Sequence, residues 1–142
     1  VLFMERCLRL LKPGGRMGIV LPEGVLNNQN LQKVREYFED RAKIVLITSI
    51  PQDVFVASGA TVKPSVVFMK KFTKEESVKF ASVKKESEKE INDKYVFEIE
   101  KIKKEQLSKK DIDKKIKEIE SLKTEEIRKL IKEKFDYEIP FN

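Results

Sequence analysis

Residues 8–22 read Leu-Arg-Leu-Leu-Lys-Pro-Gly-Gly-Arg-Met-Gly-Ile-Val-Leu-Pro, and this stretch decides the fold. Apolar side chains recur at helical spacing over residues 2–11, and the Lys-Pro-Gly-Gly that follows contains residues that end helices. Residues 16–21 are then a short apolar run closed by a proline, which is typical of a strand buried on both faces. The stretch therefore predicts a helix that leads directly into a buried strand.

The chain after this junction predicts a small α/β domain. Residues 31–38 repeat apolar side chains at helical intervals, and residues 43–50 form a second apolar run that ends at Pro51. A strand, a helix and a strand in succession indicate a crossover of the kind that builds parallel sheets covered by helices. The loop before a third strand, at residues 64–69, is too short for a crossover. The last two strands should therefore pair antiparallel, as a hairpin.

Lysine and glutamate dominate the sequence from Thr73 onward, which predicts a helical arm. Narrow Ile and Leu stripes indicate coiled-coil-like helices at residues 109–122 and 124–134, with Ser108 and Thr124 as N-caps. Tyr95-Val96-Phe97 interrupts the preceding helical stretch with residues that also suit a strand, and we expect this cluster to pack the arm against the domain. Residues 135–141 alternate apolar and polar side chains, which is typical of a strand.

Composition and charge restrict the classes of function. The 142 residues carry a net charge of +6, and the surplus lies before Thr73, where 11 Lys and Arg face 6 Asp and Glu. A basic globular part suggests a polyanionic partner such as nucleic acid. The absence of His and the single Cys7, expected in the core, exclude His-based triads, zinc chemistry and an internal disulfide. Without an apolar run long enough to span a bilayer, or a signal peptide, a cytoplasmic protein without metal is expected.

The motifs carry a resemblance to a known family. Residues 8–22 are similar to the junction between a helix and the fifth strand in Rossmann-like, S-adenosylmethionine-dependent methyltransferases. Residues 20–28 (VLPEGVLNN), 49–55 (SIPQDVF) and 58–68 (SGATVKPSVVF) resemble the modification subunits of type I restriction-modification systems, which are N-6 adenine DNA methylases. The resemblance is continuous over residues 1–71, although Lys-Pro-Ser stands where the family more often has Lys-Thr-Ser.

The resemblance implies a fold and a division of the chain. Residues 1–72 would be the C-terminal half of a Rossmann-like methyltransferase sheet, mixed and ending in an antiparallel hairpin. Residues 73–134 would be a charged helical insertion, and residues 135–142 the start of the strand that returns to the domain. The chain begins inside an apparent helix, so we expect it to be a piece of a longer protein.

Two motifs of the family have no counterpart in these 142 residues. The glycine-rich cofactor loop is missing, and the five prolines stand alone, so no Asn-Pro-Pro-aromatic motif exists. In the family, the first holds the cofactor and the second hydrogen-bonds the amine of the flipped adenine. We therefore expect the isolated chain to bind no S-adenosylmethionine and to be inactive. The resemblance implies S-adenosylmethionine as the cofactor of the parent protein, and DNA, a specificity subunit and a restriction subunit as its partners.

Three residues are candidates for contacts with DNA. The resemblance implies that Phe55, in the loop between the last two strands, stacks on the extruded target base; alternatively, it packs under its own loop. Lys63 and Lys43 are candidates for phosphate contacts, although a single lysine on a loop is often merely solvated. Asp53 and Glu23 receive no catalytic role, because methyl transfer to an amine requires mainly positioning and hydrogen bonding.

Two other functions remain open on the sequence. A non-enzymatic module could use the helical arm to bind a partner. A methyltransferase that acts on RNA or on a small molecule would share the Leu-Lys-Pro-Gly-Gly junction, but not the run from Pro51 to Phe68.

Overall fold

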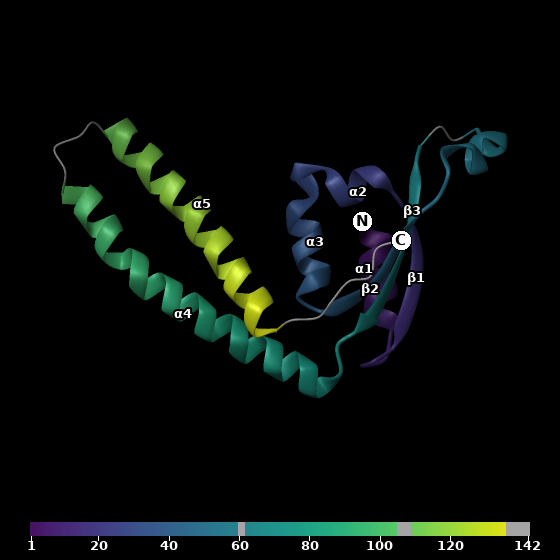
Figure 1. The fold of residues 1–142 in the computed structure, drawn as a ribbon, viewed down its shortest axis with the longest axis horizontal. Helices are drawn as coiled ribbons and strands as arrows, with labels where there is room; N and C mark the ends of the chain where they lie inside the picture. The colour runs from purple at the N-terminus through teal and green to yellow at the C-terminus, as the bar shows by residue number, and fades with distance from the viewer. Residues whose placement is uncertain (60–61, 105–108, 136–142) are drawn as a thin grey trace. The chain divides into compact units, whose positions relative to one another are not determined.

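The computed structural model describes residues 1–59, 62–104 and 109–135 (Figure 1). Residues 1–77 form one compact unit, and the described residues from 78 to 135 form a second. Among the described residues, no helix is both long and apolar enough to cross a membrane. The elements, in chain order, are α1 (Leu2–Leu10), β1 (Arg16–Pro22), α2 (Glu23–Asn27), η1 (Gln29–Leu31), α3 (Gln32–Glu39), β2 (Ala42–Ser49), η2 (Gln52–Ser58), β3 (Pro64–Lys71), α4 (Lys74–Lys104) and α5 (Lys109–Lys134).

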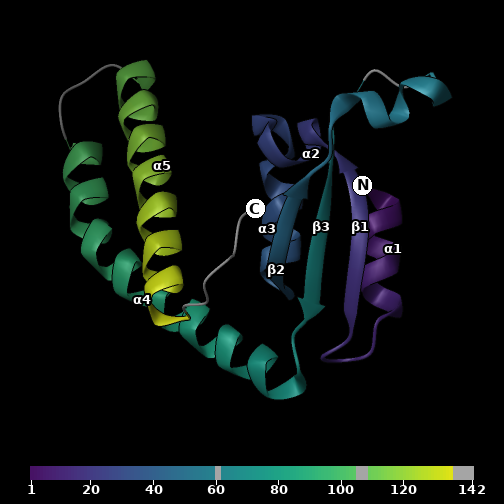
Figure 2. The ribbon, with the colours of Figure 1, turned by 45° about the vertical axis from the view of Figure 1, so that its right-hand side comes forward.

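The first unit is built on a three-stranded sheet with the order β1-β3-β2 (Figure 2). β3 pairs antiparallel with both neighbours, so the antiparallel hairpin expected for the last two strands is confirmed. β1 and β2 run in the same direction, as the helical crossover between them requires, but β3 lies between them. The expected mixed sheet is therefore not found in the described part of the chain, where every strand pair is antiparallel.

The Lys-Pro-Gly-Gly junction forms a tight turn between α1 and β1. Gly14 has φ +76°, which only glycine adopts readily, and the Gly15 N–H donates to the Lys12 carbonyl at 2.8 Å. Proline followed by a left-handed glycine is the pattern of a type II turn. The Lys71 ammonium at the end of β3 donates to the Leu8 and Leu11 carbonyls at 3.0 and 2.8 Å, which neutralises the C-terminal end of α1.

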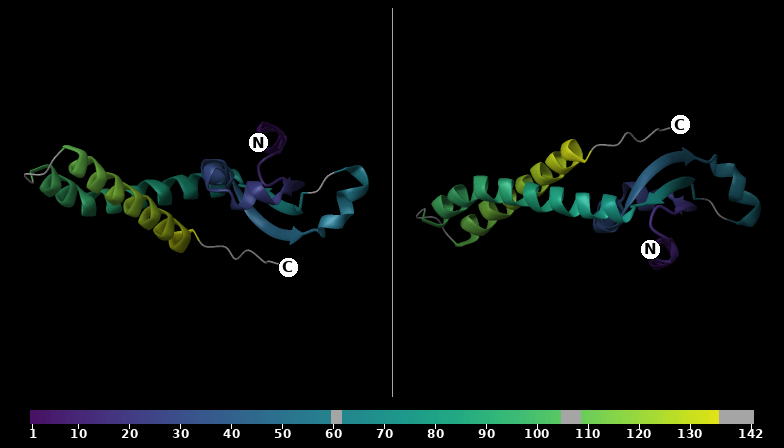
Figure 3. Two further views of the ribbon diagram at one scale, coloured as in Figure 1. Left: turned by 90° about the horizontal axis from the view of Figure 1, so that it is seen from above. Right: turned by 90° about the horizontal axis from the view of Figure 1, so that it is seen from below.

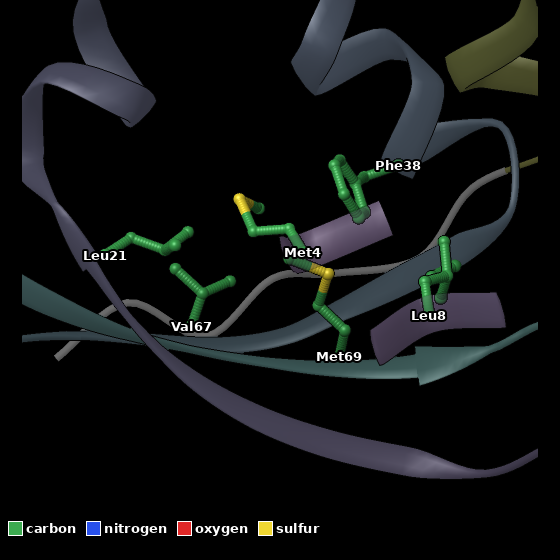
Figure 4. Close-up of a cluster of buried hydrophobic side chains, with 7 residues drawn as sticks. Met4, Leu8, Leu21, Phe38, Val67 and Met69 are labelled. Carbon is green, nitrogen blue, oxygen red and sulfur yellow. The ribbon is translucent and has the colours of Figure 1, made fainter. Parts of the chain in front are cut away.

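The core of this unit lies on one face of the sheet, under α1, α2 and α3. Met4 and Leu8 of α1 and Phe38 of α3 pack against Val67 and Met69 of β3, and all five side chains are buried (Figure 4). In α1, Met4 and Leu8 thus form the buried face, while other apolar residues of the same helix lie on its exposed face.

The outward face of α1 exposes large apolar side chains beside Arg6 and Arg9, and it corrects the expectation that Cys7 lies in the core. Phe3 and Leu10 are 73% and 70% exposed, and Cys7, expected in the core, is half-buried. The inward face is instead set by side chains that lie one residue further along the helix. Periodicity found the helix, but a helix with apolar residues on two faces does not reveal which one is inside.

The opposite face of the sheet is also apolar and exposed. Val20 and Phe68 are 52% and 42% exposed, and the Phe68 ring lies over Gly18, where an added Cβ would be 2.9 Å from its Cε1 atom. Residues 16–21 were expected to be buried on both faces, and this is wrong for the described chain, because its helices cover one face only. A shallow hollow between Arg16, Leu46 and Phe68 marks the uncovered side.

The second unit is a pair of antiparallel helices (Figure 3). α4 is continuous through Tyr95-Val96-Phe97, so the expected interruption there is wrong. α5 is also continuous: Thr124 is not an N-cap, because its hydroxyl donates to the Glu120 carbonyl at 2.7 Å inside the helix. The returning strand was predicted at residues 135–142, but Phe135 is a turn residue whose N–H donates to the Ile131 carbonyl at 2.8 Å. Residues 136–142 of that strand and the predicted cap at Ser108 lie outside the described residues.

Side chains along one face of α4 join the two helices of this unit. Phe80, Ser87 and Tyr95 are buried, and the Phe80 ring packs edge-to-face on Phe135 with the centroids 5.2 Å apart. The Tyr95 hydroxyl donates to Glu126 Oε1 at 2.9 Å. Tyr95 therefore packs within the arm, whereas Phe97, from the same cluster, is 77% exposed.

Candidate functional site

One end of the sheet collects the segments that carry two of the three candidate residues. At this end β1 finishes, β2 finishes and β3 begins, with Pro22 opposite Pro64 and Ser49 opposite Ser65 in the register. The Glu23 N–H donates to the Lys63 carbonyl at 3.0 Å, just beyond the paired strands. The loop that contains Phe55 is therefore anchored on both sides by strand ends.

Phe55 lies in η2, the short 3-10 helix of this loop. Its side chain is half-buried, while its neighbours Val54 and Val56 are 56% and 55% exposed. Gly59 ends the turn with φ +75°, and its N–H donates to the Val56 carbonyl at 2.9 Å. The loop thus presents an apolar surface in which the aromatic ring is partly accessible. Stacking on a base and packing under the loop both fit this half-buried ring.

Lys63 lies at the same end of the sheet as Phe55. Its ammonium is 3.9 Å from Glu23 Oε1, and both side chains are about half exposed, at 48% and 45%. An exposed pair at this distance is weak, on the order of 0.2 to 1 kcal/mol. A stronger anion could therefore displace the carboxylate, so Lys63 is placed where a phosphate contact is chemically feasible.

Lys43 lies at the other end of the sheet. It is the second residue of β2, opposite Lys70 in the register, and the six residue steps from it to Ser49 span roughly 20 Å. Its ammonium is 2.8 Å from Glu76 Oε1, with 29% and 23% of the two side chains exposed. The structure therefore does not bring Lys43 together with Phe55 and Lys63.

The cluster around Lys43 is a helix cap that the sequence prediction missed. The Thr73 N–H donates to Glu76 Oε2 at 2.9 Å, and the Glu76 N–H donates to Thr73 Oγ1 at 3.1 Å. This reciprocal pair is a capping box at the start of α4, and its signal was present as Thr-x-x-Glu. The hydrogen bond from Lys43, and then the backbone hydrogen bond from Thr73, hold the pKa of Glu76 below its ordinary value.

The glycines of the junction do not fit a cofactor loop. Such a loop follows a strand and opens a helix, whereas Gly14 and Gly15 follow a helix and open a strand. The Gly14 N–H already donates to the Lys71 carbonyl at 3.1 Å, and Gly18 is covered by the Phe68 ring. These glycines therefore do not form a phosphate-binding loop of that kind. In the described ranges, no three acidic, Cys or His side chains are grouped so that they could hold a metal ion.

Comparison with known proteins gives two findings. The family model described as N-6 DNA Methylase matches residues 1–138. Among curated proteins, the Defense against restriction protein B of Escherichia phage P1 is 30% identical to this chain over 81 residues. The matched region covers 57% of this chain and 4% of that protein, so the chain spans a small part of this relative.

Proposed function

Because the chain belongs to the N-6 DNA methylase family, we propose that it forms the part of a DNA adenine-N6 methyltransferase that faces the target base. The observation that carries the proposal is the location of Phe55 and Lys63 at one end of the sheet, in one loop between strand ends. An aromatic ring can stack on an extruded base, and a lysine in the same loop can contact a phosphate. In this proposal Lys43 supports the fold from the opposite end.

The exposed apolar surface supports the view that the chain works as part of a larger catalytic domain. One face of the sheet and the outward face of α1 expose large apolar side chains, among them Leu2, Phe3, Val20 and Phe68. Apolar surface of this kind marks places where other protein segments bind. We propose that the segments with the cofactor loop and the Asn-Pro-Pro-aromatic motif bind there, and that S-adenosylmethionine is held by those segments.

The finer assignment is to the modification subunit of a type I restriction-modification system in the cytoplasm. It is supported by the resemblance of residues 20–28, 49–55 and 58–68 to those subunits. The name of the phage P1 relative also refers to restriction. DNA and the specificity and restriction subunits are the partners in this proposal. A methyltransferase for RNA or a small molecule is less well supported, because it would not share the run from Pro51 to Phe68.

Calorimetric titration with S-adenosylmethionine tests the proposal that the cofactor is held by segments other than these 142 residues. The 142-residue chain should give no binding heat, because its glycines are engaged in the turn and under Phe68. The full-length protein that contains this chain should bind the cofactor and transfer its methyl group to adenine in DNA. Cofactor binding by the 142-residue chain would show that the cofactor site lies within it and would contradict the proposed division.

A further inference from the structure

Charge is divided unequally along the helical pair. The part near the α4–α5 connection, residues 101–104 and 110–117, carries seven lysines and two acids. The remaining parts of the two helices in this unit, residues 78–100 and 118–134, carry ten basic and eleven acidic residues. The net positive charge of the pair is therefore concentrated at the end where α4 finishes and α5 begins.

The lysines at this end form two regular rows. Lys110, Lys114 and Lys117 lie at positions i, i+4 and i+7 of α5, so they share one face of the helix. Lys101 and Lys104 of α4 share a face with Phe97 at the same spacing, and Phe97 is 77% exposed. All five lysines are exposed. We call these six residues the basic tip.

Ion pairing distinguishes the basic tip from the rest of the helices. Away from the tip, Lys94 lies 2.8 Å from Glu126, Lys134 lies 2.9 Å from Glu90, and Lys129 lies 3.3 Å from Glu125. Among the described side chains, no carboxylate forms an ion pair with a lysine of the basic tip.

Lysines of each row that lie three or four residues apart repel each other. Acids stand four residues before one lysine of each row, Asp113 before Lys117 and Glu100 before Lys104, and the net charge of the tip stays positive. An anionic partner would remove this repulsion. A row from i to i+7 is about 10 Å long, since each helical residue rises about 1.5 Å. This length is roughly the axial rise of three base pairs of a duplex.

We propose that the basic tip binds the phosphate backbone of duplex DNA, as a second contact remote in sequence from the loop of Phe55. The proposal rests on the DNA substrate proposed above and adds a surface to it. The lysines contact phosphates, and the exposed Phe97 ring lies beside them, where it can contact the deoxyribose. Such contacts carry no sequence preference, so they increase affinity and residence on DNA without selecting the site.

Fluorescence anisotropy of the 142-residue chain with a labelled duplex tests the proposal, in a salt series. The tip variant is Lys110→Gln, Lys114→Gln and Lys117→Gln. The control variant is Lys79→Gln, Lys85→Gln and Lys89→Gln, which removes the same charge from exposed positions on α4. Gln has nearly the helix propensity of Lys, and circular dichroism should show equal helix content in all three proteins.

The tip variant should bind roughly tenfold more weakly, and its slope of log K against log salt should fall by about 2.7, or about 0.9 for each lost phosphate contact. The control variant should bind within about twofold of the parent chain, since its lysines release no counterions. Equal loss in both variants, tighter binding to RNA of the same length, or no affinity for the duplex would overturn the proposal.

Adenine methylation by the full-length protein distinguishes failure of this proposal from failure of the proposed function. If the full-length protein methylates adenine but its tip variant keeps the parent's DNA affinity, the proposed contact of the basic tip is wrong and the proposed function stands. Methyl transfer to RNA rejects the proposed function.

Discussion

Glu76 makes one contact with a residue near it in the sequence, Thr73, and one with a residue far from it, Lys43. Glu76 accepts from the Thr73 N–H at 2.9 Å and from the Lys43 ammonium at 2.8 Å. The contact with Thr73 is local and could be predicted from the Thr-x-x-Glu spacing. The contact with Lys43 joins residues that are far apart in the chain, so the sequence indicated only a candidate phosphate contact or a solvated side chain at Lys43. Its partner became visible only when β2 and α4 were placed.

Replacement of Glu76 by Gln should make the stability of the first unit less dependent on pH. Gln keeps the capping hydrogen bond but loses the charge opposite Lys43, so unfolding free energy at neutral pH should fall by about 0.5 kcal/mol. The pKa of Glu76 is lowered in the folded protein, so its stabilisation is complete above the unfolded pKa and is lost as pH falls through the folded value. Urea unfolding at several pH values measures this.

Glu75→Gln is the matched control for this measurement. Glu75 is an exposed acid in the same first turn of α4, so its replacement changes the helix-end charge equally. If both variants lose the same stability with the same pH dependence, the helix dipole explains the effect. The contact with Lys43 would then contribute nothing.

At the scale of elements, periodicity predicted α1, β1, α3, β2 and β3 in their order, but not the short helix α2, where a loop was expected, nor the continuity of the arm. Tyr95-Val96-Phe97 favours a strand locally, yet Tyr95 packs against α5 and donates to Glu126. Thr124 satisfies its hydroxyl within the helix, on the Glu120 carbonyl. Tertiary packing therefore overrides both local preferences, as is usual for weak propensities.

Ser87 provides a test of how tightly α4 and α5 pack. It is 0% exposed, and its hydroxyl has no hydrogen-bond partner among the described residues. Ser87→Ala should therefore raise the unfolding free energy by about 1 kcal/mol, because an unsatisfied buried hydroxyl is removed. Ser87→Leu should lower it by roughly 1 to 3 kcal/mol, because a larger side chain forces the helices apart.

Thermal unfolding of both variants, together with Ser82→Ala, checks this account. Ser82 lies exposed on the same helix and donates to the Lys79 carbonyl, so its replacement reports helix propensity without burial. Destabilisation by Ser87→Ala would show that the hydroxyl has a hydrogen-bond partner. Unchanged stability of Ser87→Leu would show that α4 and α5 are loosely packed at this position.

At the scale of the whole molecule, the sequence predicted the strands and the family more successfully than the burial of the sheet. The apolar run at residues 16–21 indicates a strand with two covered faces, and the structure covers one. The strand order could not be predicted, because the apolar patterns do not specify that β3 inserts between β1 and β2. Phe55 and Lys63 could be placed in one loop from the sequence, whereas the location of Lys43 at the opposite end required the register of β2 on β3.

The central claim is that this chain presents the target base to an adenine methyltransferase, and Phe55→Ala in the full-length protein tests it most directly. The measurement is transfer of labelled methyl groups from S-adenosylmethionine to the N6 atom of adenine in duplex DNA. Val56→Ala, at the next residue of the same loop and 55% exposed, is the control. Stacking on an extruded base is worth roughly 1 to 3 kcal/mol, so Phe55→Ala should lower kcat/KM by about five- to more than a hundredfold.

The duplex affinity and thermal stability of Phe55→Ala should stay close to those of the parent, and Phe55→Trp should recover part of the activity. Methylation at the parent rate by Phe55→Ala, or an equal loss in Val56→Ala, would contradict the account.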